Sequence, residues 1–341
     1  MRCVARIVLA ASFAALACGC GGGRDPGSGE AGNAPFLVVS NRGGAWRVYE
    51  TGRDGRGARL VGSPRADEAS YTDTQPARLP DGAIAFVSDR GGRPALWLRP
   101  RGAEEARPVL GMPAAAGGAA PNAGTSDSDP APFGADGIVF ARAEDPGGGA
   151  DPAQAPATVG RDLYLARRDG TGLRRLTTDP ADDGAPCVLP DGRSIVFASA
   201  RRGGPELFRL DASAADPEAT AAPLRSLDRA VSDDAPACLP DGSILFARST
   251  GGGPSQVFQA RFTDRGLAAR QITDAATLPY GAGEPVPLAD GTILLTAGPG
   301  PANGGPRYAV YGISGGGYNL ARVTRERAGY EDLTRRLRPP R

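Results

Sequence analysis

The chain has 341 residues, of which 50 are glycine and 32 are proline. Both residue types are unfavourable in the interior of a helix. Its 39 basic and 38 acidic residues give a net charge of +1, without the basic excess of a typical nucleic-acid-binding protein. Histidine is absent, which excludes a Ser-His-Asp triad. Composition therefore excludes a mostly helical protein and argues against a nucleic-acid partner.

Residues 1–17 predict a signal peptide. Arg2 and Arg6 precede an uncharged, mostly apolar stretch over residues 7–17. That stretch is shorter than the roughly 20 residues that a membrane-spanning helix needs, and its charge pattern is typical of a secretory signal. We therefore expect the chain to leave the cytoplasm.

The residues after this stretch resemble a bacterial lipobox. Leu16 and Ala17 precede Cys18, and the resemblance implies that this cysteine carries the lipid of the mature chain. Cys20 is the alternative lipid site, and an ordinary cleaved signal also stays open. Because glycine rather than aspartate follows either cysteine, we expect the outer membrane, with the protein facing the periplasm and touching the membrane through its lipid alone. Residues 18–34 would form a flexible tether.

A turn built on Asp-Gly recurs along the rest of the chain at spacings of 49 to 55 residues. Its aspartates are Asp81, Asp136, Asp191, Asp241 and Asp290. Each turn precedes a β-branched and aromatic run, and Asp-Gly between apolar runs is a strong hairpin signal. A second glycine-rich turn and two further short strands follow in each unit. Repeated four-stranded units of this length indicate a β-propeller.

Residues 35–341 are predicted to form an all-β, six-bladed propeller of four-stranded antiparallel blades. The first unit, which begins at Phe36, lacks a segment for its innermost strand. The tyrosine and aspartate of residues 330–338 match Tyr71 and Asp73, which open the first complete repeat. We therefore expect residues 330–338 to supply the missing strand, so that the N- and C-terminal segments pair and close the ring.

An Asp-x-x-Pro segment precedes the first strand of four units, and it begins at Asp73, Asp129, Asp183 and Asp233. If these strands are the innermost of their blades, the four carboxylates ring one mouth of the axis. A polar ligand or Ca²⁺ would suit such a ring, because hard cations prefer carboxylate oxygens. The other interpretation is that each aspartate caps its own loop. No other metal or cofactor is expected.

The complete pattern, from Asp-x-x-Pro through Pro-Asp-Gly to the final Leu-Thr, resembles the WD40-like repeat of TolB-like propellers, over about residues 34–341. The resemblance implies the fold but no single function, because the repeat occurs in binding proteins and in peptidase accessory domains. The N-terminal α/β domain of TolB does not fit between the tether and the first repeat, so a role in the Tol system is not expected.

The expected function is a monomeric, non-catalytic scaffold that binds an envelope protein or polysaccharide. A carbohydrate-active enzyme that uses the axial carboxylates is the alternative, since paired carboxylates hydrolyse glycosides without histidine. A peptidase accessory domain is a third possibility.

Two cysteines occupy equivalent inner strands of neighbouring units. Cys187 lies one residue, and Cys238 two residues, after the proline of its Asp-x-x-Pro segment. Side chains alternate across a strand, so the two thiols either face each other across the blade interface or both face away. A disulfide and a pair of buried thiols both stay open.

Overall fold

The apolar run after each Asp-Gly turn forms the second strand of a blade. In the computed structural model these strands carry the most deeply buried aromatic side chains, since Phe86, Phe140, Phe197 and Phe246 are each 0% exposed. Neighbouring blades cover both faces of such a strand, and a strand covered on both faces favours a continuous apolar run over an alternating one.

The structure describes residues 9–10, 36–40, 45–52, 57–62, 71–110, 124–144, 160–224, 231–264, 266–288, 290–298, 301–302, 305–306, 309–314, 319–323 and 335–336. Within these ranges, no helical segment has the length and hydropathy needed to cross a membrane.

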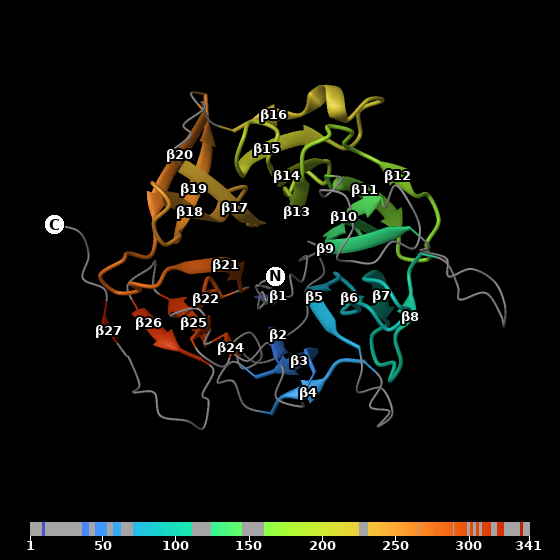
Figure 1. Ribbon diagram of the computed structural model, residues 1–341, viewed down its shortest axis with the longest axis horizontal. Coiled ribbons are helices and arrows are strands. Elements are labelled where there is room, and N and C mark those ends of the chain that lie inside the picture. The colour runs from blue at the N-terminus through green and yellow to red at the C-terminus, as the bar shows by residue number, and fades with distance from the viewer. Residues whose placement is uncertain are drawn as a thin grey trace, which may run out of the picture.

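The strands form six antiparallel sheets around a central axis, as Figure 1 shows. In each blade the strands are given from the axis outward. Blade one consists of β1 (Leu9–Ala10), β2 (Phe36–Ser40), β3 (Arg47–Thr51) and β4 (Arg59–Leu60), blade two of β5 (Asp73–Arg78), β6 (Ile84–Ser88), β7 (Ala95–Arg99) and β8 (Arg107–Pro108), and blade three of β9 (Thr125–Phe133), β10 (Gly137–Glu144), β11 (Asp162–Arg167) and β12 (Arg174–Arg175). Blade four consists of β13 (Asp183–Val188), β14 (Ser194–Ser199), β15 (Glu206–Asp211) and β16 (Ala222–Pro223), blade five of β17 (Val231–Cys238), β18 (Ile244–Thr250), β19 (Gln256–Thr263) and β20 (Gly266–Gln271), and blade six of β21 (Ala282–Pro287), β22 (Ile293–Ala297), β25 (Ala309–Ser314), β26 (Asn319–Arg322) and β27 (Arg335–Arg336). The predicted six-bladed propeller is therefore confirmed, and its blades are four-stranded as predicted except for blade six, whose sheet has five strands. A short hairpin of β23 (Pro301–Ala302) and β24 (Gly305–Pro306) lies within blade six, and a 3-10 turn, η2 (Glu218–Thr220), precedes β16.

Successive blades are joined by one backbone hydrogen bond that recurs at five junctions. In each, a residue at or near the start of an inner strand donates its N–H to a carbonyl that lies just before the third strand of the preceding blade. The donor and acceptor residues are Asp73 and Trp46, Asp127 and Pro94, Asp183 and Arg161, Asp233 and Pro205, and Ala282 and Ser255, with N···O distances of 2.7 to 2.9 Å. This repeated bond sets the position of each inner strand along the axis relative to its neighbour.

Apolar packing between blades one and six closes the ring. Phe36 and Val38 of β2 share a cluster of buried side chains with Val286, Leu294 and Val310 of blade six. Among the described residues, blades one and six thus meet through side-chain packing, without a strand exchanged between them.

The position of the C-terminal segment corrects the closure predicted from the sequence. The innermost strand of blade one is β1, in which Leu9 pairs with Val38 and Ala10 with Leu37. The strand β27 pairs with β26 at the outer edge of blade six. The prediction that residues 330–338 form the inner strand of blade one is therefore wrong for residues 335 and 336, and the rest of that segment lies outside the described residues.

The environment of β2 gives the physical reason for this difference. Leu37 and Val38 are 0% and 3% exposed, so the innermost position lies beside an apolar core. A leucine and an alanine suit that position by residue type, whereas two arginines would have to be desolvated there.

Gly170 lies in a tight contact between blades two and three. Its φ is +86°, and a Cβ on it would lie 2.2 Å from the carbonyl oxygen of Val109. We expect Gly170→Ala to lower the free energy of unfolding by about 2–3 kcal/mol, since backbone of another blade must move. Gly172→Ala is the matched control, because it has a similar positive φ but its nearest neighbouring atom is 4.0 Å away, and it should cost about 1 kcal/mol. Equal losses in urea unfolding would contradict the contact.

Candidate functional site

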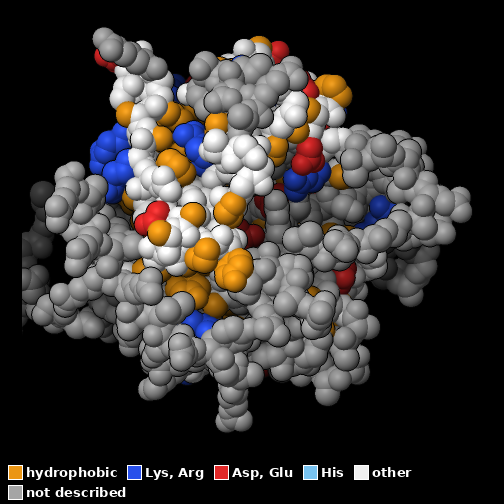
Figure 2. Space-filling view, turned by 60° about the vertical axis from the view of Figure 1, so that its left-hand side comes forward, with side chains coloured by type: hydrophobic (Ala, Val, Ile, Leu, Met, Phe, Trp, Pro, Cys, Tyr) orange, Lys and Arg blue, Asp and Glu red, His pale blue; other side chains and the backbone are white. Residues whose placement is uncertain are grey.

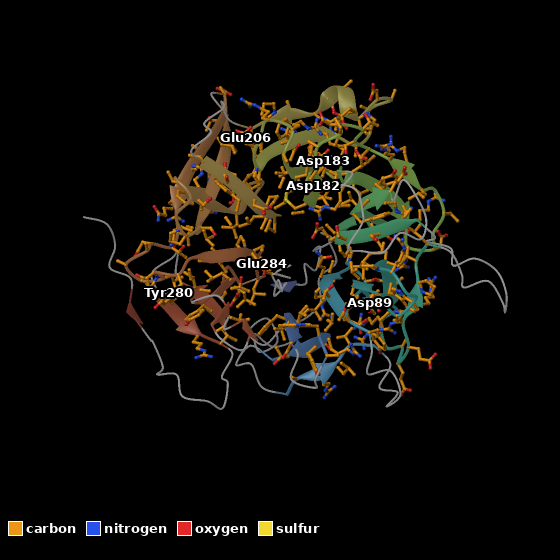
Figure 3. All side chains as sticks on the ribbon, in the orientation of Figure 1. Asp89, Asp182, Asp183, Glu206, Tyr280 and Glu284 are labelled. Atoms are coloured by element: carbon orange, nitrogen blue, oxygen red, sulfur yellow. A yellow bond between two sulfur atoms is a disulfide. The ribbon has the colours of Figure 1, made fainter. Side chains whose placement is uncertain are left out.

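Each inner strand from blade two to blade six contains the same bulge. The residue before the motif's proline has a φ between 48° and 52°, and these residues are Gln75, Asp129, Ala185, Ala235 and Glu284. The strand register shifts at this point in all five blades. Proline disfavours the right-handed helical region for the residue before it, and the bulge takes up the left-handed alternative. Figure 3 shows one of these residues, Glu284, beside the axis.

The bulge corrects the alignment of the repeats in blade three. Asp129 is itself the positive-φ residue, so it corresponds to Gln75, and the counterpart of Asp73 is Asp127. The segment from residue 127 to residue 132 contains two overlapping Asp-x-x-Pro matches. The number of residues to the next Asp-Gly turn does not decide between the two matches. Compared with the first aspartates of the other repeats, Asp127 lies one residue farther from its turn and Asp129 lies one residue closer. The expectation that Asp129 belongs to the ring of first aspartates is therefore wrong.

The four first aspartates are buried and form ion pairs with arginines. Each is 0–2% exposed. The pairs, with their N···O distances, are Asp73 and Arg90 at 2.8 Å, Asp127 and Arg142 at 2.7 Å, Asp183 and Arg201 at 2.7 Å, and Asp233 and Arg248 at 2.6 Å. Burial raises the pKa of Asp73 and of Asp183, and the paired arginine opposes this rise in both. These carboxylates are thus held inside the blades.

Each of these arginines also packs over aromatic rings of its own blade, at 4.4 to 5.6 Å from the ring centroids. The rings belong to Tyr71, Phe86 and Trp97; Phe140 and Tyr164; Phe197 and Phe208; and Phe246 and Phe258. A guanidinium over a ring face is stabilised by the ring quadrupole. We call each such set an Asp-Arg-aromatic unit.

Blade six shows what replaces the unit. Ala282 and Ala297 pair in the register that Asp127 and Arg142 occupy in blade three, and both alanines are buried. Aspartate and arginine are thus absent together in this blade. The joint replacement indicates that the two residues act as one structural element.

A polar network joins blades two, three and four at the level of the bulges. The Gln75 amide donates to Asp129 at 2.6 Å, and the Asp129 N–H donates to Gln75 at 3.1 Å. Arg161 donates to Asp129 and to Asp182, each at 2.7 Å. The hydrogen bond to Asp182 raises the pKa of Arg161 further above its ordinary value. We call these four residues the axial network.

The two adjacent aspartates of blade four have opposite environments. Asp183 is fully buried, whereas the side chain of Asp182 is 50% exposed, and both are labelled in Figure 3. The exposed end of the axial network therefore offers a carboxylate that is already paired with Arg161. A surface of this kind suits a polar partner that exchanges hydrogen bonds with it.

The calcium interpretation finds no ligand set among the described residues. Within those ranges, no three aspartate, glutamate or cysteine side chains converge closely enough to hold a metal ion. Of the four aspartates predicted to ring the axis, three lie in Asp-Arg-aromatic units and Asp129 lies in the axial network.

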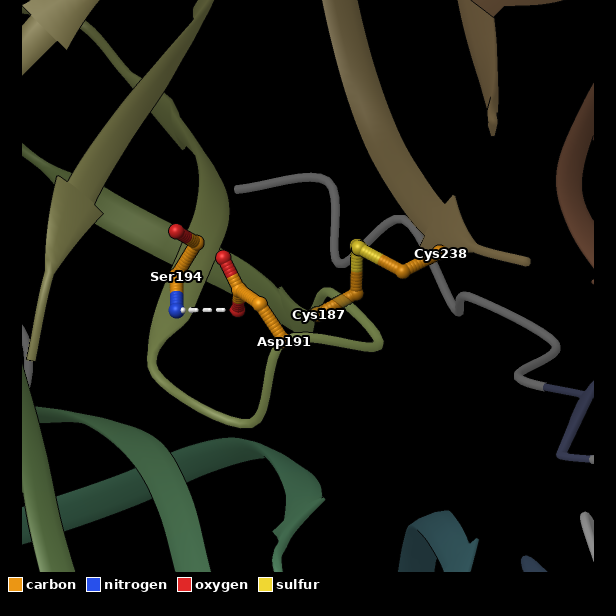
Figure 4. The surroundings of a disulfide bond; sticks show 4 residues. All are labelled: Cys187, Asp191, Ser194 and Cys238. Atoms are coloured by element: carbon orange, nitrogen blue, oxygen red, sulfur yellow. Dashed lines mark hydrogen bonds between the residues drawn. A yellow bond between two sulfur atoms is a disulfide. The ribbon is translucent and has the colours of Figure 1, made fainter. Parts of the chain in front are cut away.

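Cys187 and Cys238 form a disulfide between the inner strands of blades four and five, as Figure 4 shows. Their Cα atoms are 5.6 Å apart. The adjacent Asp-Gly turn is closed by the carboxylate of Asp191, which accepts the N–H of Ser194 at 2.8 Å. Of the two states that the sequence left open, the structure contains the bonded one. The proposed lipid sites, Cys18 and Cys20, lie outside the described residues.

Asp162 gives the protein an acid-range pH dependence. Burial raises its pKa to about 6, although Arg175 lowers it. The folded state therefore holds this proton more tightly than the unfolded state, whose aspartate pKa is about 4. Its contribution is complete below about pH 4 and is lost as the pH rises through about 6.

As the pH is raised from 4 to 6.5, the native chain should lose about 2 kcal/mol of unfolding free energy relative to Asp162→Asn, which has no carboxyl group to ionise at this position. Urea unfolding of both proteins at several pH values measures this difference. Because the variant also loses the contact with Arg175, its absolute stability is not compared. Only the change of the difference with pH reports on the pKa of Asp162. Parallel pH profiles for the two proteins would contradict the raised pKa.

No protein family model matches the chain. It is 32% identical over 181 residues to a TolB homologue of Chlorobium luteolum, a match that covers 52% of this chain and 34% of that protein. It is also 43% identical over 47 residues to the Tol-Pal system protein TolB of Bordetella pertussis, which is 14% of this chain and 11% of that one. The chain thus spans about a third or less of the length of these relatives.

The structure of TolB from Acinetobacter baumannii superposes with a TM-score of 0.57 at 17% identity, over 84% of this chain and 62% of that one. The fold of this propeller is therefore similar to that of the TolB propeller. An oligogalacturonate lyase from Vibrio parahaemolyticus has a TM-score of 0.52 at 11% identity, over 88% of this chain and 76% of that one. At such low identities these neighbours show the fold alone, so the TolB-like propeller does not by itself distinguish binding from catalysis.

Proposed function

We propose that the protein is a lipid-anchored, non-catalytic binding scaffold of the cell envelope, with its TolB-like propeller as the binding module. The observation that carries this proposal is the repeated Asp-Arg-aromatic unit. It uses four repeated carboxylates of the chain to hold the strands of single blades together.

The same observation removes three of the four axial carboxylates on which the enzymatic alternative rests. Glycoside hydrolysis requires two carboxyl groups about 5–10 Å apart that both reach the substrate. Asp73, Asp183 and Asp233 are at most 1% exposed and paired with arginines, so they cannot approach a sugar without unfolding their blade. Contacts with a partner are then left to the polar surface, of which the axial network is one part.

The envelope location is supported by two findings. The disulfide between Cys187 and Cys238 suits an oxidising compartment such as the periplasm. The related protein of Bordetella pertussis bears the name of the Tol-Pal system, and we carry over from it only an envelope setting. We propose that Cys18, or alternatively Cys20, bears the lipid, and that a monomeric propeller faces the periplasm from the outer membrane and binds a protein or polysaccharide there.

Metabolic labelling with an alkyne fatty acid tests the anchor. We expect label and membrane fractionation for the native chain and for Cys20→Ser, and loss of both for Cys18→Ser. The reverse pattern would assign the lipid to Cys20. A soluble, unlabelled product from the native chain would overturn the anchor.

Site-directed photo-crosslinking in living cells tests the binding role. A photoreactive residue in place of the exposed Asp182 should give one discrete adduct, whereas the same residue at the exposed Arg193 serves as a surface control. Purified protein should release no reducing ends from envelope polysaccharides. Measurable release would overturn the non-catalytic role.

A further inference from the structure

Arg99, the last residue of β7, is a half-buried cation that has no counter-charge among the described residues. Elsewhere charges of both signs are interspersed, as Figure 2 shows in blue and red on the side of the ring that contains blades five and six. Surface arginines such as Arg168 and Arg261 form ion pairs with aspartates. Within the described ranges, Arg99 has no ion pair, hydrogen bond or aromatic contact, and its buried Nε–H has no acceptor. A charge that is partly desolvated without a partner destabilises the folded state.

The register of blade two places Arg78 on the same face of the sheet as Arg99. Both residues pair with Ile84 of the intervening strand β6, and residues directly opposite each other project from one face of a sheet. Ile84 belongs to the buried cluster that blade two shares with Leu37 of blade one. The two guanidinium groups therefore lie at the seam between blades one and two, at the end of the blades where the Asp81 turn lies.

Blade one supplies a carboxylate to this seam. Glu50 pairs in register with Leu37, so it projects towards blade two, and it accepts a hydrogen bond from Nη2 of Arg78. Arg59 lies opposite Glu50 on β4 and is exposed. Among the described residues, these facing rows thus hold three cations and one carboxylate. Since Glu50 balances Arg78, the half-buried charge that is left over is that of Arg99.

Three buried polar atoms on this face of blade two have no partner among the described residues, and all three are donors. They are Nε of Arg78, Nε of Arg99 and the indole nitrogen of Trp97, which lies two residues before Arg99 on β7. Burial lowers the pKa of Arg99, a shift that Glu50 opposes and Arg78 increases. A bound anion would supply both the missing acceptors and the missing counter-charge.

We propose that Arg99, Arg78 and Glu50 form a seam site that binds the carboxylate of a small molecule. A guanidinium offers Nε–H and Nη–H in one plane, which matches the two oxygens of a carboxylate. One negative charge balances Arg99, so a monoanion fits this site better than a phosphate dianion does. Trp97 and Ala106 pack against the same cluster, and a short apolar tail can lie beside them.

The seam site is independent of the scaffold role proposed above. It shares no residue with the axial network. Because its donors are buried between two blades, a small ligand reaches them more readily than a polymer does. The inference therefore goes beyond the proposed function and adds a ligand of a different class.

Calorimetric titration of the full chain in detergent with sodium propionate, at constant ionic strength, tests the proposal. We expect saturable binding of propionate and none of propionamide, which has a similar shape but no charge. Inorganic phosphate, as the dianion, should bind about tenfold more weakly, since it brings one charge more than Arg99 balances. Absence of propionate binding, or phosphate binding that is equally tight, would overturn the carboxylate site.

Two variants of blade two assign the binding to one face. Arg99→Met keeps an apolar stem but removes the cation, and it should weaken propionate binding by about tenfold or more. Arg107→Met is the matched control, because Arg107 is exposed and pairs with Leu98, which belongs to the cluster on the opposite face of the blade. It should bind propionate as the native chain does. Equal affinities for the two variants would overturn the site.

Two further measurements keep the test independent of folding defects. Without ligand, Arg99→Met should melt no lower than the native chain, because it removes an unpaired, half-buried charge. Glu50→Gln releases Arg78 from its carboxylate and should tighten propionate binding by about tenfold. Unchanged or weaker binding by Glu50→Gln, at an unchanged melting temperature, would overturn the proposal. None of these results affects the fatty-acid labelling or the crosslinking at Asp182, so failure here is distinguishable from failure of the proposed function.

Discussion

Asp127→Ala is expected to lower the free energy of unfolding by about 3–5 kcal/mol, measured by urea denaturation. Asp127 is 2% exposed and Arg142 is 7% exposed, so the variant leaves a guanidinium buried without its carboxylate. It also removes the acceptor of the Leu96 N–H, a hydrogen bond of 3.2 Å to blade two.

The double variant Asp127→Ala/Arg142→Ala should recover part of this loss. It reproduces the pairing of Ala282 with Ala297, which the chain already uses in blade six. Asp129→Ala is the comparison within the same strand. The Asp129 side chain is 12% exposed and its partner Arg161 is 28% exposed, so the loss of this ion pair should cost less, about 2 kcal/mol. A double variant less stable than Asp127→Ala would show that the arginine is stabilised by its aromatic contacts alone.

Loss of the disulfide is expected to lower the free energy of unfolding by about 4 kcal/mol. Cys187 and Cys238 are 51 positions apart, and a cross-link that closes a loop of that length reduces the entropy of the unfolded chain by roughly this amount. Cys187→Ser/Cys238→Ser and chemical reduction of the native chain should therefore have similar effects in urea unfolding.

Urea unfolding of Cys187→Ser/Cys238→Ser with and without reductant is the control for effects of the reductant on other parts of the protein. It should change nothing, since the bonded pair is gone. If the native chain unfolds at the same urea concentration with and without reductant, the bond between blades four and five contributes no stability.

The sequence predicted the propeller because its signals are local. Asp-Gly turns such as the one at Asp241 need only neighbouring residues, and the Ser243 hydroxyl that donates to this carboxylate lowers the pKa of Asp241. Turn chemistry repeated about every 50 residues, with apolar runs between the turns, is sufficient to predict most of the strands and the number of blades.

The Asp-Arg-aromatic units could not be predicted in the same way. Arg90 and Arg201 stand four residues after the phenylalanine of their second strand, whereas Arg142 and Arg248 stand two residues after theirs. Because the side chain is long, both spacings bring the guanidinium to the same aspartate position. A repeat alignment compares fixed positions, so it does not register this equivalence, nor did it separate Asp127 from Asp129.

The strand β1 bears on the order in which the chain is translocated, cleaved and folded. Leu9 and Ala10 lie within the predicted leader, yet they pair with Val38 and Leu37 in the folded ring. A precursor that folded before export would enclose part of its own leader, and a signal peptidase would meet a substrate already held in a sheet. If cleavage occurs before Cys18, translocation has to precede folding, and the mature chain folds without the strand that completes blade one of the precursor.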